Sequence, residues 1–159
     1  MSTETIYNYR RADDQTITGG QPDAAQLAAA AAEGVRAVIN LAPDDPERSL
    51  PDEAGLVQSL GMAYYHVPVD WNAPREEDYA AFEAAMAARP PGRVLIHCAA
   101  NYRATAFFAL YAMRQRGWSA AEAEAFRASV WRGSDYPVWE AFIARMRARI
   151  EGLGAAGEA

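Results

Sequence analysis

Residues 93–105 read Arg-Val-Leu-Ile-His-Cys-Ala-Ala-Asn-Tyr-Arg-Ala-Thr and contain the only cysteine of the chain, Cys98. The apolar run 94–96 predicts a buried strand, and a long helical pattern begins a few residues after the cysteine. A strand that ends directly at a helix start leaves backbone N–H groups directed outward, and the positive end of the helix dipole reinforces them. We therefore expect an anion-binding loop with Cys98 at its floor and Arg103 at its edge.

The surroundings of the cysteine favour a reactive residue. A thiol is a nucleophile only as its thiolate, which a helix N-terminus and a neighbouring guanidinium both stabilise. A lone cysteine is most often a buried structural residue. Here His97 precedes Cys98, Arg103 follows it, and a strand passes into a helix between them, so we interpret Cys98 as functional.

Outward from this stretch, strands alternate with helices. Strands are expected at 35–41, 63–69 and 94–97, with a short edge hairpin formed by 7–9 and 16–18. Helices are expected at 22–34, 51–61, 75–89, 104–116 and 137–151. One more helix is expected to begin at the capping box Ser119-x-x-Glu122. This alternation predicts an α/β fold with a central, mostly parallel sheet of about four to five strands flanked by helices.

The length of 159 residues predicts a single domain, residues 1–159, with a disordered tail at 152–159. One cysteine excludes an internal disulfide and suits a reducing compartment. No apolar run is long enough to cross a membrane, and residues 1–11 lack the apolar core of a signal peptide. We therefore expect a cytoplasmic protein without a membrane partner.

The charge of the chain limits the ligands that it can attract. The net charge is −6 and every basic residue is an arginine. An acidic chain with scattered arginines argues against a nucleic-acid partner, and an anionic ligand would have to be captured locally. The chain has only two histidines and one cysteine, so it offers few ligands for a zinc site. We expect no metal and no cofactor.

Polar residues follow three of the expected strands. Asn40 ends one strand, Asp70 follows the next, and His97-Cys98 ends the third. In a parallel sheet, sites form beyond the carboxyl ends of the strands. This arrangement is a second indication of a site, independent of the loop.

The segment His97-Cys98-Ala99-Ala100-Asn101-Tyr102-Arg103-Ala104-Thr105 resembles the signature loop of the cysteine-dependent protein tyrosine and dual-specificity phosphatases. The segments 17–22 and 34–41 resemble the opening strands of that family, and 66–70 resembles the segment that carries its general acid. The chain is most similar to a bacterial branch, the beta-lactamase hydrolase-like phosphatase domains, over roughly residues 15–145.

The resemblance implies a cysteine-phosphatase-like fold and the hydrolysis of phosphate monoesters, in a phosphorylated protein or a small phosphate ester. Cys98 would attack phosphorus and form a thiophosphate intermediate. Arg103 would hold two phosphate oxygens through its bidentate fork, and Asp70 would be the general acid.

The resemblance also implies a binding site, which phosphate or sulfate would occupy. His97 would fix the loop and the thiolate, and the hydroxyl of Thr105 would stabilise the cysteine as it leaves. Trp71 and Tyr102 could form the wall of the pocket and stack on an aryl group. The backbone amides that would bind the anion belong to Ala99, Ala100, Asn101, Tyr102 and Arg103.

The spacing of the loop leaves two alternatives open. Four residues separate Cys98 from Arg103, whereas the phosphatase signature has five. Asn101 stands in place of the mid-loop glycine, and asparagine tolerates the positive φ that the turn needs. The bacterial branch shares the shortened loop, and many rhodanese-like sulfurtransferases have this length. The alternatives are therefore a sulfurtransferase that carries a persulfide on Cys98 and a catalytically silent anion-binding module.

Asp70 favours phosphate over sulfur chemistry. Cleavage of a phosphate ester needs a proton at the leaving oxygen, whereas sulfur transfer to a thiophile has no comparable need. Other polar residues are weaker candidates. Glu76, Glu77 and Asp78 are fallback acids better explained by a solvated helix start, and Gln21 and Asn40 could brace the loop. His66 is interpreted as a packed or edge histidine instead of a catalyst.

Overall fold

A computed structural model describes residues 2–158 of the chain. A five-stranded sheet with the order β1-β2-β5-β3-β4 lies at its centre. The parallel strands are β2 (Thr16–Gly19), β3 (Val35–Asn40), β4 (Ala63–His66) and β5 (Arg93–His97), and the edge strand β1 (Arg10–Asp13) is antiparallel to β2. The expected α/β fold with a mostly parallel sheet is confirmed.

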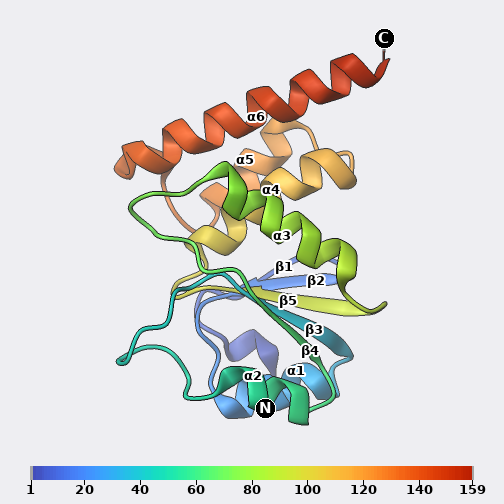
Figure 1. Cartoon of the computed structure of the whole chain (residues 1–159), viewed down its shortest axis with the longest axis vertical. Helices are drawn as coiled ribbons and strands as arrows, with labels where there is room; N and C mark the ends of the chain where they lie inside the picture. Colours follow the sequence, from blue (N-terminus) through green and yellow to red (C-terminus); the bar gives the residue numbers. More distant parts are fainter. Residues whose placement is uncertain (1, 159) are drawn as a thin grey trace.

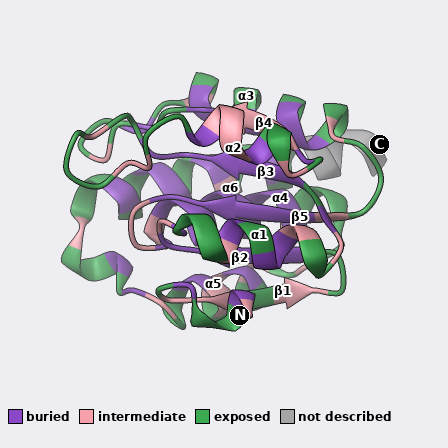
Figure 2. Ribbon diagram, turned by 90° about the horizontal axis from the view of Figure 1, so that it is seen from below, coloured by how far each residue is buried: buried purple, intermediate pink, exposed green. Residues whose placement is uncertain are grey.

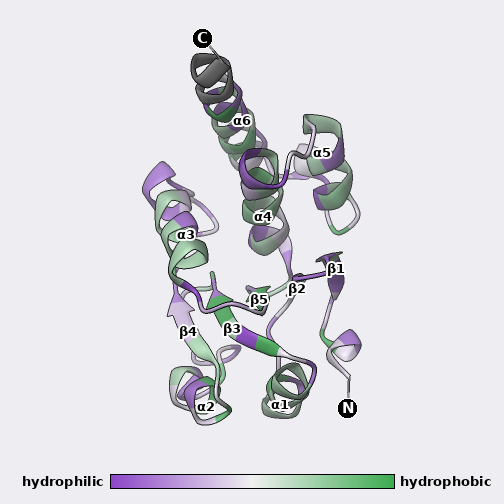
Figure 3. Ribbon diagram, turned by 90° about the vertical axis from the view of Figure 1, so that its right-hand side faces the viewer, coloured by the Kyte–Doolittle hydropathy of each residue, from purple (hydrophilic) through white to green (hydrophobic). Residues whose placement is uncertain are grey.

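Helices cover both faces of the sheet (Figure 1). Helices α1 (Ala24–Ala32) and α2 (Glu53–Ser59) lie on one face. Helices α3 (Glu76–Ala88), α4 (Tyr102–Gln115) and α6 (Pro137–Glu158) lie on the other, where α5 (Ala120–Ala128) packs against α4. Figure 3 shows the strands between these two helical layers. Two short 3-10 helices, Thr3–Thr5 and Gly133–Asp135, complete the chain.

Strand β5 lies between β2 and β3 and is buried on both faces (Figure 2). Successive side chains of a strand point to opposite faces. Val94 and Ile96 accordingly pack in the larger core, with residues of α3, α4 and α6, whereas Leu95 packs in the smaller core with residues of α1 and α2. The same alternation sends His97 toward α2 and Cys98 toward the larger core.

The chain ends of the fold differ from the expected boundaries. The first strand is Arg10–Asp13 instead of 7–9, because Asn8 adopts a left-handed conformation (φ 53°) that an extended strand does not contain. The last helix continues to Glu158, past the expected end at residue 151. Ala159 lies outside the described residues, and disorder of 152–159 stays a prediction. No helix in residues 2–158 is both long and apolar enough to span a bilayer.

An aromatic cluster joins the helices of the larger layer. Phe107 of α4 is fully buried, and its ring contacts those of Tyr79 and Phe82 on α3, at 5.7 Å between centroids in each case, and of Trp139 and Phe142 on α6, at 6.1 Å. This one side chain therefore connects three helices.

We predict that Phe107→Ala lowers the free energy of unfolding by about 3–5 kcal/mol, because it removes apolar contacts and leaves a cavity. Urea denaturation followed by far-UV circular dichroism measures this. The control is Val138→Ala on α6, whose side chain is 53% exposed, and its effect should stay within about 0.5 kcal/mol. Equal effects of the two substitutions would contradict the described core.

Candidate active site

The loop between β5 and α4 makes a tight turn at Asn101. Strand β5 ends at His97, and α4 begins at Tyr102, two residues earlier than expected. Asn101 precedes the helix with φ 70° and ψ 8°, a left-handed conformation that asparagine tolerates better than most residues. The loop therefore makes its turn without a glycine, and Arg103 lies in the first turn of the helix.

The N-terminal segment braces this loop from outside. The side-chain Nδ2 of Asn101 donates to the carbonyl of Asn8 (2.7 Å) and to Oγ1 of Thr18 (3.0 Å). Nδ2 of Asn8 donates in return to the carbonyl of Ala100 (3.0 Å). Asn8 and Asn101 thus lock the segment and the loop together, although 93 positions separate them.

Two carbonyl groups of the loop accept hydrogen bonds from the N-terminal part of the chain, whereas several loop amides are free to bind a ligand. The carbonyl of Ala99 accepts from the amide of Gln21 (3.1 Å), as that of Ala100 accepts from Asn8. The amides of Ala99, Ala100, Tyr102 and Arg103 donate to no acceptor in residues 2–158. Free amides at the start of a helix are suited to bind an anion.

One edge of the Arg103 guanidinium is also free. Nη1 donates to the carbonyl of Val69 (2.8 Å), whereas Nε is buried and has no acceptor in the described part of the chain. The side chain is 8% exposed, so an unpaired donor at this depth costs about 1–3 kcal/mol. The Nε and Nη2 edge presents two parallel N–H groups, which fit two oxygens of an oxyanion.

Asp70 and Arg103 line the same cavity. This cavity, of about 320 Å³, is also lined by Ala99 and Trp71. Asp70 is exposed, follows Val69 directly, and accepts from the amide of Asn72 through Oδ1 (2.9 Å), as a turn-forming aspartate does. The structure thus brings the expected acid and the expected arginine together at one opening.

Cys98 lies deeper than the residues that line this cavity. It is fully buried, it does not line the cavity, and its sulfur forms no hydrogen bond with any described residue. Thr105, expected to assist the thiol, is engaged elsewhere. Its Oγ1 lies 2.7 Å from the carbonyl oxygen of Asn101 and 3.0 Å from that of Tyr102, and accepts from Nε1 of Trp131 (3.1 Å). In this structure Thr105 supports the helix start and does not contact the sulfur through a hydrogen bond.

Trp71 and Tyr102 belong to an aromatic cluster beside the cavity. Trp71 stacks on Trp139 (5.1 Å between centroids), and Tyr102 stacks on Trp131 (5.4 Å). Nε1 of Trp139 donates to the carbonyl of Trp71 (2.7 Å). Burial and the neighbouring Tyr136 hydroxyl raise the pKa of Tyr102 above its ordinary value, so its phenol is neutral at physiological pH. The cluster fixes the segment that carries Asp70.

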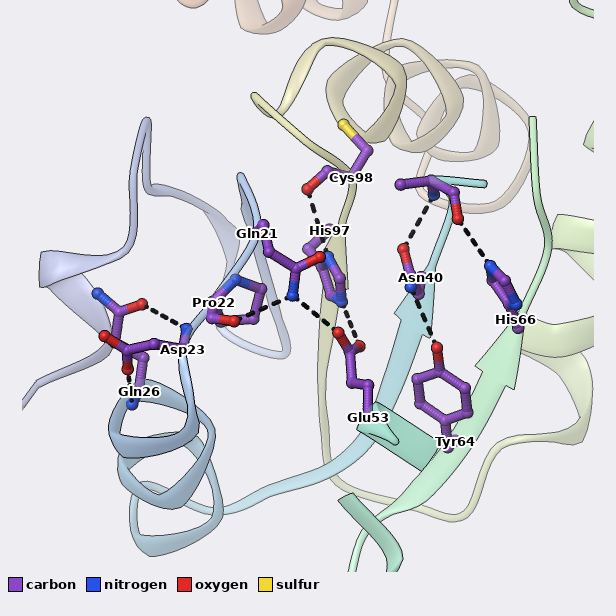
Figure 4. A network of polar contacts seen from close by, with 11 residues as sticks. Gln21, Pro22, Asp23, Gln26, Asn40, Glu53, Tyr64, His66, His97 and Cys98 are labelled. Carbon is purple, nitrogen blue, oxygen red and sulfur yellow. Dashed lines mark hydrogen bonds and ion pairs between the residues drawn. The ribbon is translucent and has the colours of Figure 1, made fainter. Parts of the chain in front are cut away.

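No pattern in the sequence indicated Glu53, the partner of His97. Glu53 opens helix α2, and its Oε2 lies 2.6 Å from Nε2 of His97 (Figure 4). Burial raises the pKa of Glu53, but the hydrogen bond and charge of His97 and the hydrogen bond from Gln21 outweigh it, and the pKa falls below its ordinary value. The charged pair therefore stabilises the fold above the carboxyl's unfolded pKa, and this stability is lost as the pH falls through the folded value.

The other residues considered from the sequence have structural partners. Gln21 braces the loop as expected, whereas Asn40 accepts from the amide of Ala42 (2.9 Å) and donates to the Tyr64 hydroxyl (3.1 Å). His66 is exposed at the end of β4 with Nε2 2.6 Å from the carbonyl of Ala42.

The fallback acids at the start of α3 are engaged in ion pairs or exposed. Asp78 pairs with Arg75 (2.9 Å), Glu76 pairs with Arg145 (3.7 Å), and Glu77 is exposed. No group of three or more His, Cys, Asp and Glu side chains in residues 2–158 is arranged to hold a metal ion.

Comparisons with known proteins give consistent relatives. Residues 9–117 match the family model of the beta-lactamase hydrolase-like protein, phosphatase-like domain. A beta-lactamase hydrolase-like protein of Xylella fastidiosa (strain Temecula1) is 35% identical over 101 residues, which cover 62% of this chain and 23% of that protein. This chain therefore spans less than a quarter of the length of the curated relatives that it matches.

Solved structures extend the comparison to the whole fold. A candidate phosphatase from Shewanella putrefaciens CN-32 has a TM-score of 0.85 at 35% identity and covers 92% of each chain. TpbA of P. aeruginosa, in complex with pTyr, has a TM-score of 0.69 at 17% identity and covers 95% of this chain and 93% of its own. The second likeness, at this identity, concerns the fold alone.

We predict that Asn101→Gly and Asn101→Ala separate the two contributions of this residue. Both lose the hydrogen bonds to Asn8 and Thr18, at a cost of about 1–3 kcal/mol. Alanine also disfavours the left-handed backbone, so Asn101→Ala should be less stable than Asn101→Gly by about 1 kcal/mol. Urea denaturation of both variants measures the difference. An alanine variant as stable as the glycine variant would contradict the left-handed turn.

Proposed function

Because the chain belongs to the family of beta-lactamase hydrolase-like phosphatase domains and has a protein tyrosine phosphatase-like fold, we propose that it is a cysteine-dependent hydrolase of phosphate monoesters. The observation that carries this proposal is the free, buried edge of Arg103. Arg103 lines the same cavity as Asp70, and its own amide is one of the loop amides that donate to no described acceptor. An anion-binding group and an acid at one opening are what cleavage of a phosphate ester requires.

The ligand that fits these donors is a tetrahedral oxyanion. The Nε and Nη2 edge of Arg103 would take two oxygens, and the free loop amides would take the third. The net charge of −6 repels anions at long range, so these local donors have to supply the binding energy. A doubly charged phosphate monoester gains most from them, because charge-assisted hydrogen bonds are about twice as strong as neutral ones.

The reaction would follow in two steps. The thiolate of Cys98 attacks phosphorus, the bond to the ester oxygen breaks, and Asp70 gives its proton to the leaving oxygen. A water molecule then loses a proton to the Asp70 carboxylate and attacks the thiophosphate, which breaks the S–P bond and returns the thiolate with inorganic phosphate. Sγ is buried in the described conformation, so the phosphoryl group has to reach it between Ala99 and Arg103.

The aromatic wall of the cavity supports a substrate with an aryl group. Trp71 lines the cavity, and the ring of Tyr102 packs against the ring of Trp71 at 5.8 Å between centroids. Aromatic pairs of this kind contribute about 0.5–1.5 kcal/mol beyond the area that they bury. The similar fold of TpbA was solved in complex with pTyr. We propose phosphotyrosine, in a protein or as a small aryl phosphate, as the first substrate class to test.

A sulfurtransferase is the second candidate, and the spacing of the loop favours it. Four residues separate Cys98 from Arg103, a length found in many rhodanese-like enzymes. Thiosulfate is also a tetrahedral dianion, so the donors of the loop do not distinguish the two. Asp70 does, because transfer of a sulfur atom from thiosulfate to cyanide needs no proton at a leaving oxygen.

We predict that the protein hydrolyses p-nitrophenyl phosphate and that Cys98→Ser abolishes this activity. Asp70→Asn should lower kcat by about 10²–10⁴-fold, the usual contribution of a general acid. The matched control is Glu77→Gln, another exposed carboxylate, which should leave kcat unchanged. Release of p-nitrophenol measures all three variants.

The same preparation tests the second candidate when thiosulfate and cyanide replace the ester. Thiocyanate formation that requires Cys98, without phosphatase activity, would replace the first proposal by the second. Phosphate that slows alkylation of Cys98 when neither reaction occurs would indicate an anion-binding module. Hydrolysis of p-nitrophenyl phosphate that survives in Cys98→Ser would contradict the cysteine mechanism.

A further inference from the structure

A buried ion pair lies directly behind the cysteine. Glu53 and His97 are 6% and 0% exposed, and 2.6 Å separates Oε2 of the glutamate from Nε2 of the histidine. Oε1 of Glu53 accepts from Nε2 of Gln21 (2.8 Å). Both carboxylate oxygens therefore have donors, as a buried charge requires. Burying such a pair costs desolvation energy, so its presence next to the loop calls for a functional reason.

The second ring nitrogen of His97 faces the backbone of Cys98. Nδ1 lies 3.4 Å from the carbonyl oxygen of Cys98. A carbonyl oxygen only accepts hydrogen bonds, so this contact favours a proton on Nδ1. Nε2 faces the carboxylate of Glu53, which also accepts when it is ionised. A ring that donates to both acceptors is an imidazolium, with one N–H directed at Glu53 and the other at the backbone of Cys98.

We propose that Glu53 is a positioning residue of the reaction: its carboxylate holds His97 as an imidazolium, and this cation orients the first peptide of the loop and favours the thiolate of Cys98. The proposal rests on the proposed function, since it assigns Glu53 a part in the chemistry of Cys98. Glu53 itself touches neither the substrate nor the sulfur; Figure 4 shows the sulfur directed away from the pair.

The positions of the Glu53 carboxylate and the His97 ring relative to Cys98 explain why the pair would favour the thiolate. The imidazolium belongs to the residue next to Cys98 in the chain, whereas the carboxylate lies beyond it on helix α2. Figure 4 shows the ring of His97 between Cys98 and the carboxylate of Glu53, so the positive member of the pair is nearer to the residue with the thiol, and an opposite charge favours an ionised group. Glu53 keeps the ring charged, because burial without a counter-charge favours the neutral imidazole over the imidazolium.

Other charged groups around the pair and the loop line two neighbouring cavities. Glu53 lines a cavity of about 610 Å³, through which protons can reach the pair. The charged side chains that line the cavity above the loop are Asp44, Asp45, Arg48, Asp70 and Arg103. The titratable side chains that share the cavity with Glu53 are Asp44, Asp45, Asp52, Tyr64 and His66.

The test is the titration of the thiolate, which absorbs in the far ultraviolet. Because the chain has a single cysteine, the spectrum of the wild type minus that of Cys98→Ser reports this thiol alone. Glu53→Gln keeps the size of the side chain and removes its charge. We expect the midpoint of the titration to rise by about 1–3 pH units in Glu53→Gln. This titration needs no catalytic turnover, so it tests the role of Glu53 even if the protein hydrolyses no phosphate ester.

Glu33→Gln is the matched control. Glu33 is an exposed carboxylate near the amino ends of β2, β3 and β5, at the opposite end of these strands from Cys98. It accepts from the amide of Thr3 (2.9 Å), and the variant should titrate as the wild type does. An unchanged midpoint in Glu53→Gln would overturn the proposal, because the pair would then be purely structural. A lowered midpoint would also overturn it, since His97 would then keep its proton without Glu53.

A measurement on the wild type covers the case in which Glu53→Gln fails to fold. Nitrogen-15 NMR of the histidine side chains separates an imidazolium from a neutral ring. We expect one of the two histidines to remain doubly protonated at neutral pH, and His66→Gln to leave its signal in place. A neutral ring for His97 at neutral pH would contradict the proposal.

Discussion

The site depends on the alternation of side chains along β5. This strand is covered by helices on both faces, so each residue is committed to one side of the sheet. Ile96 belongs to the larger core, His97 reaches the helix α2 on the other side, and Cys98 returns to the larger core. Two adjacent residues are thus placed in separate environments. The thiol lies among apolar side chains below the loop, while the ion pair that faces its backbone lies behind the sheet.

A short loop of this kind needs support from outside. It is one residue shorter than the phosphatase signature, so it offers one amide fewer to an anion. The N-terminal segment and the loop after β2 hold its carbonyls on the far side. Gly20 allows this close approach, because a Cβ there would lie 2.7 Å from the carbonyl oxygen of Ala99 and 3.1 Å from the ring of Tyr7. The loop is therefore shaped by contacts that are distant in sequence.

The sequence predicted those parts of the site that follow from local patterns. The apolar run before Cys98 indicated the central strand, and the position of Asp70 after another parallel strand indicated the end of the sheet where Asp70 and Arg103 line one cavity. Asn8 and Glu53 were beyond such reasoning. Asn8 matters through a left-handed backbone that turns the chain away from a strand, and Glu53 through a pairing with a residue 44 positions away. Neither leaves a periodic signal, because each depends on tertiary packing.

The contact between Trp139 and Trp71 connects the last helix to the turn that carries Asp70. Trp139 lies on α6, yet it fixes the carbonyl of the residue next to Asp70, and Arg103 fixes the carbonyl on the other side. The turn that carries Asp70 is thereby held at both ends before any ligand arrives. Under the proposed function, the conformational entropy of closing a mobile lid would be lost once, when the protein folds, instead of at every turnover. Such preorganisation would favour substrates that fit the cavity and limit how far its opening can adapt to larger ones.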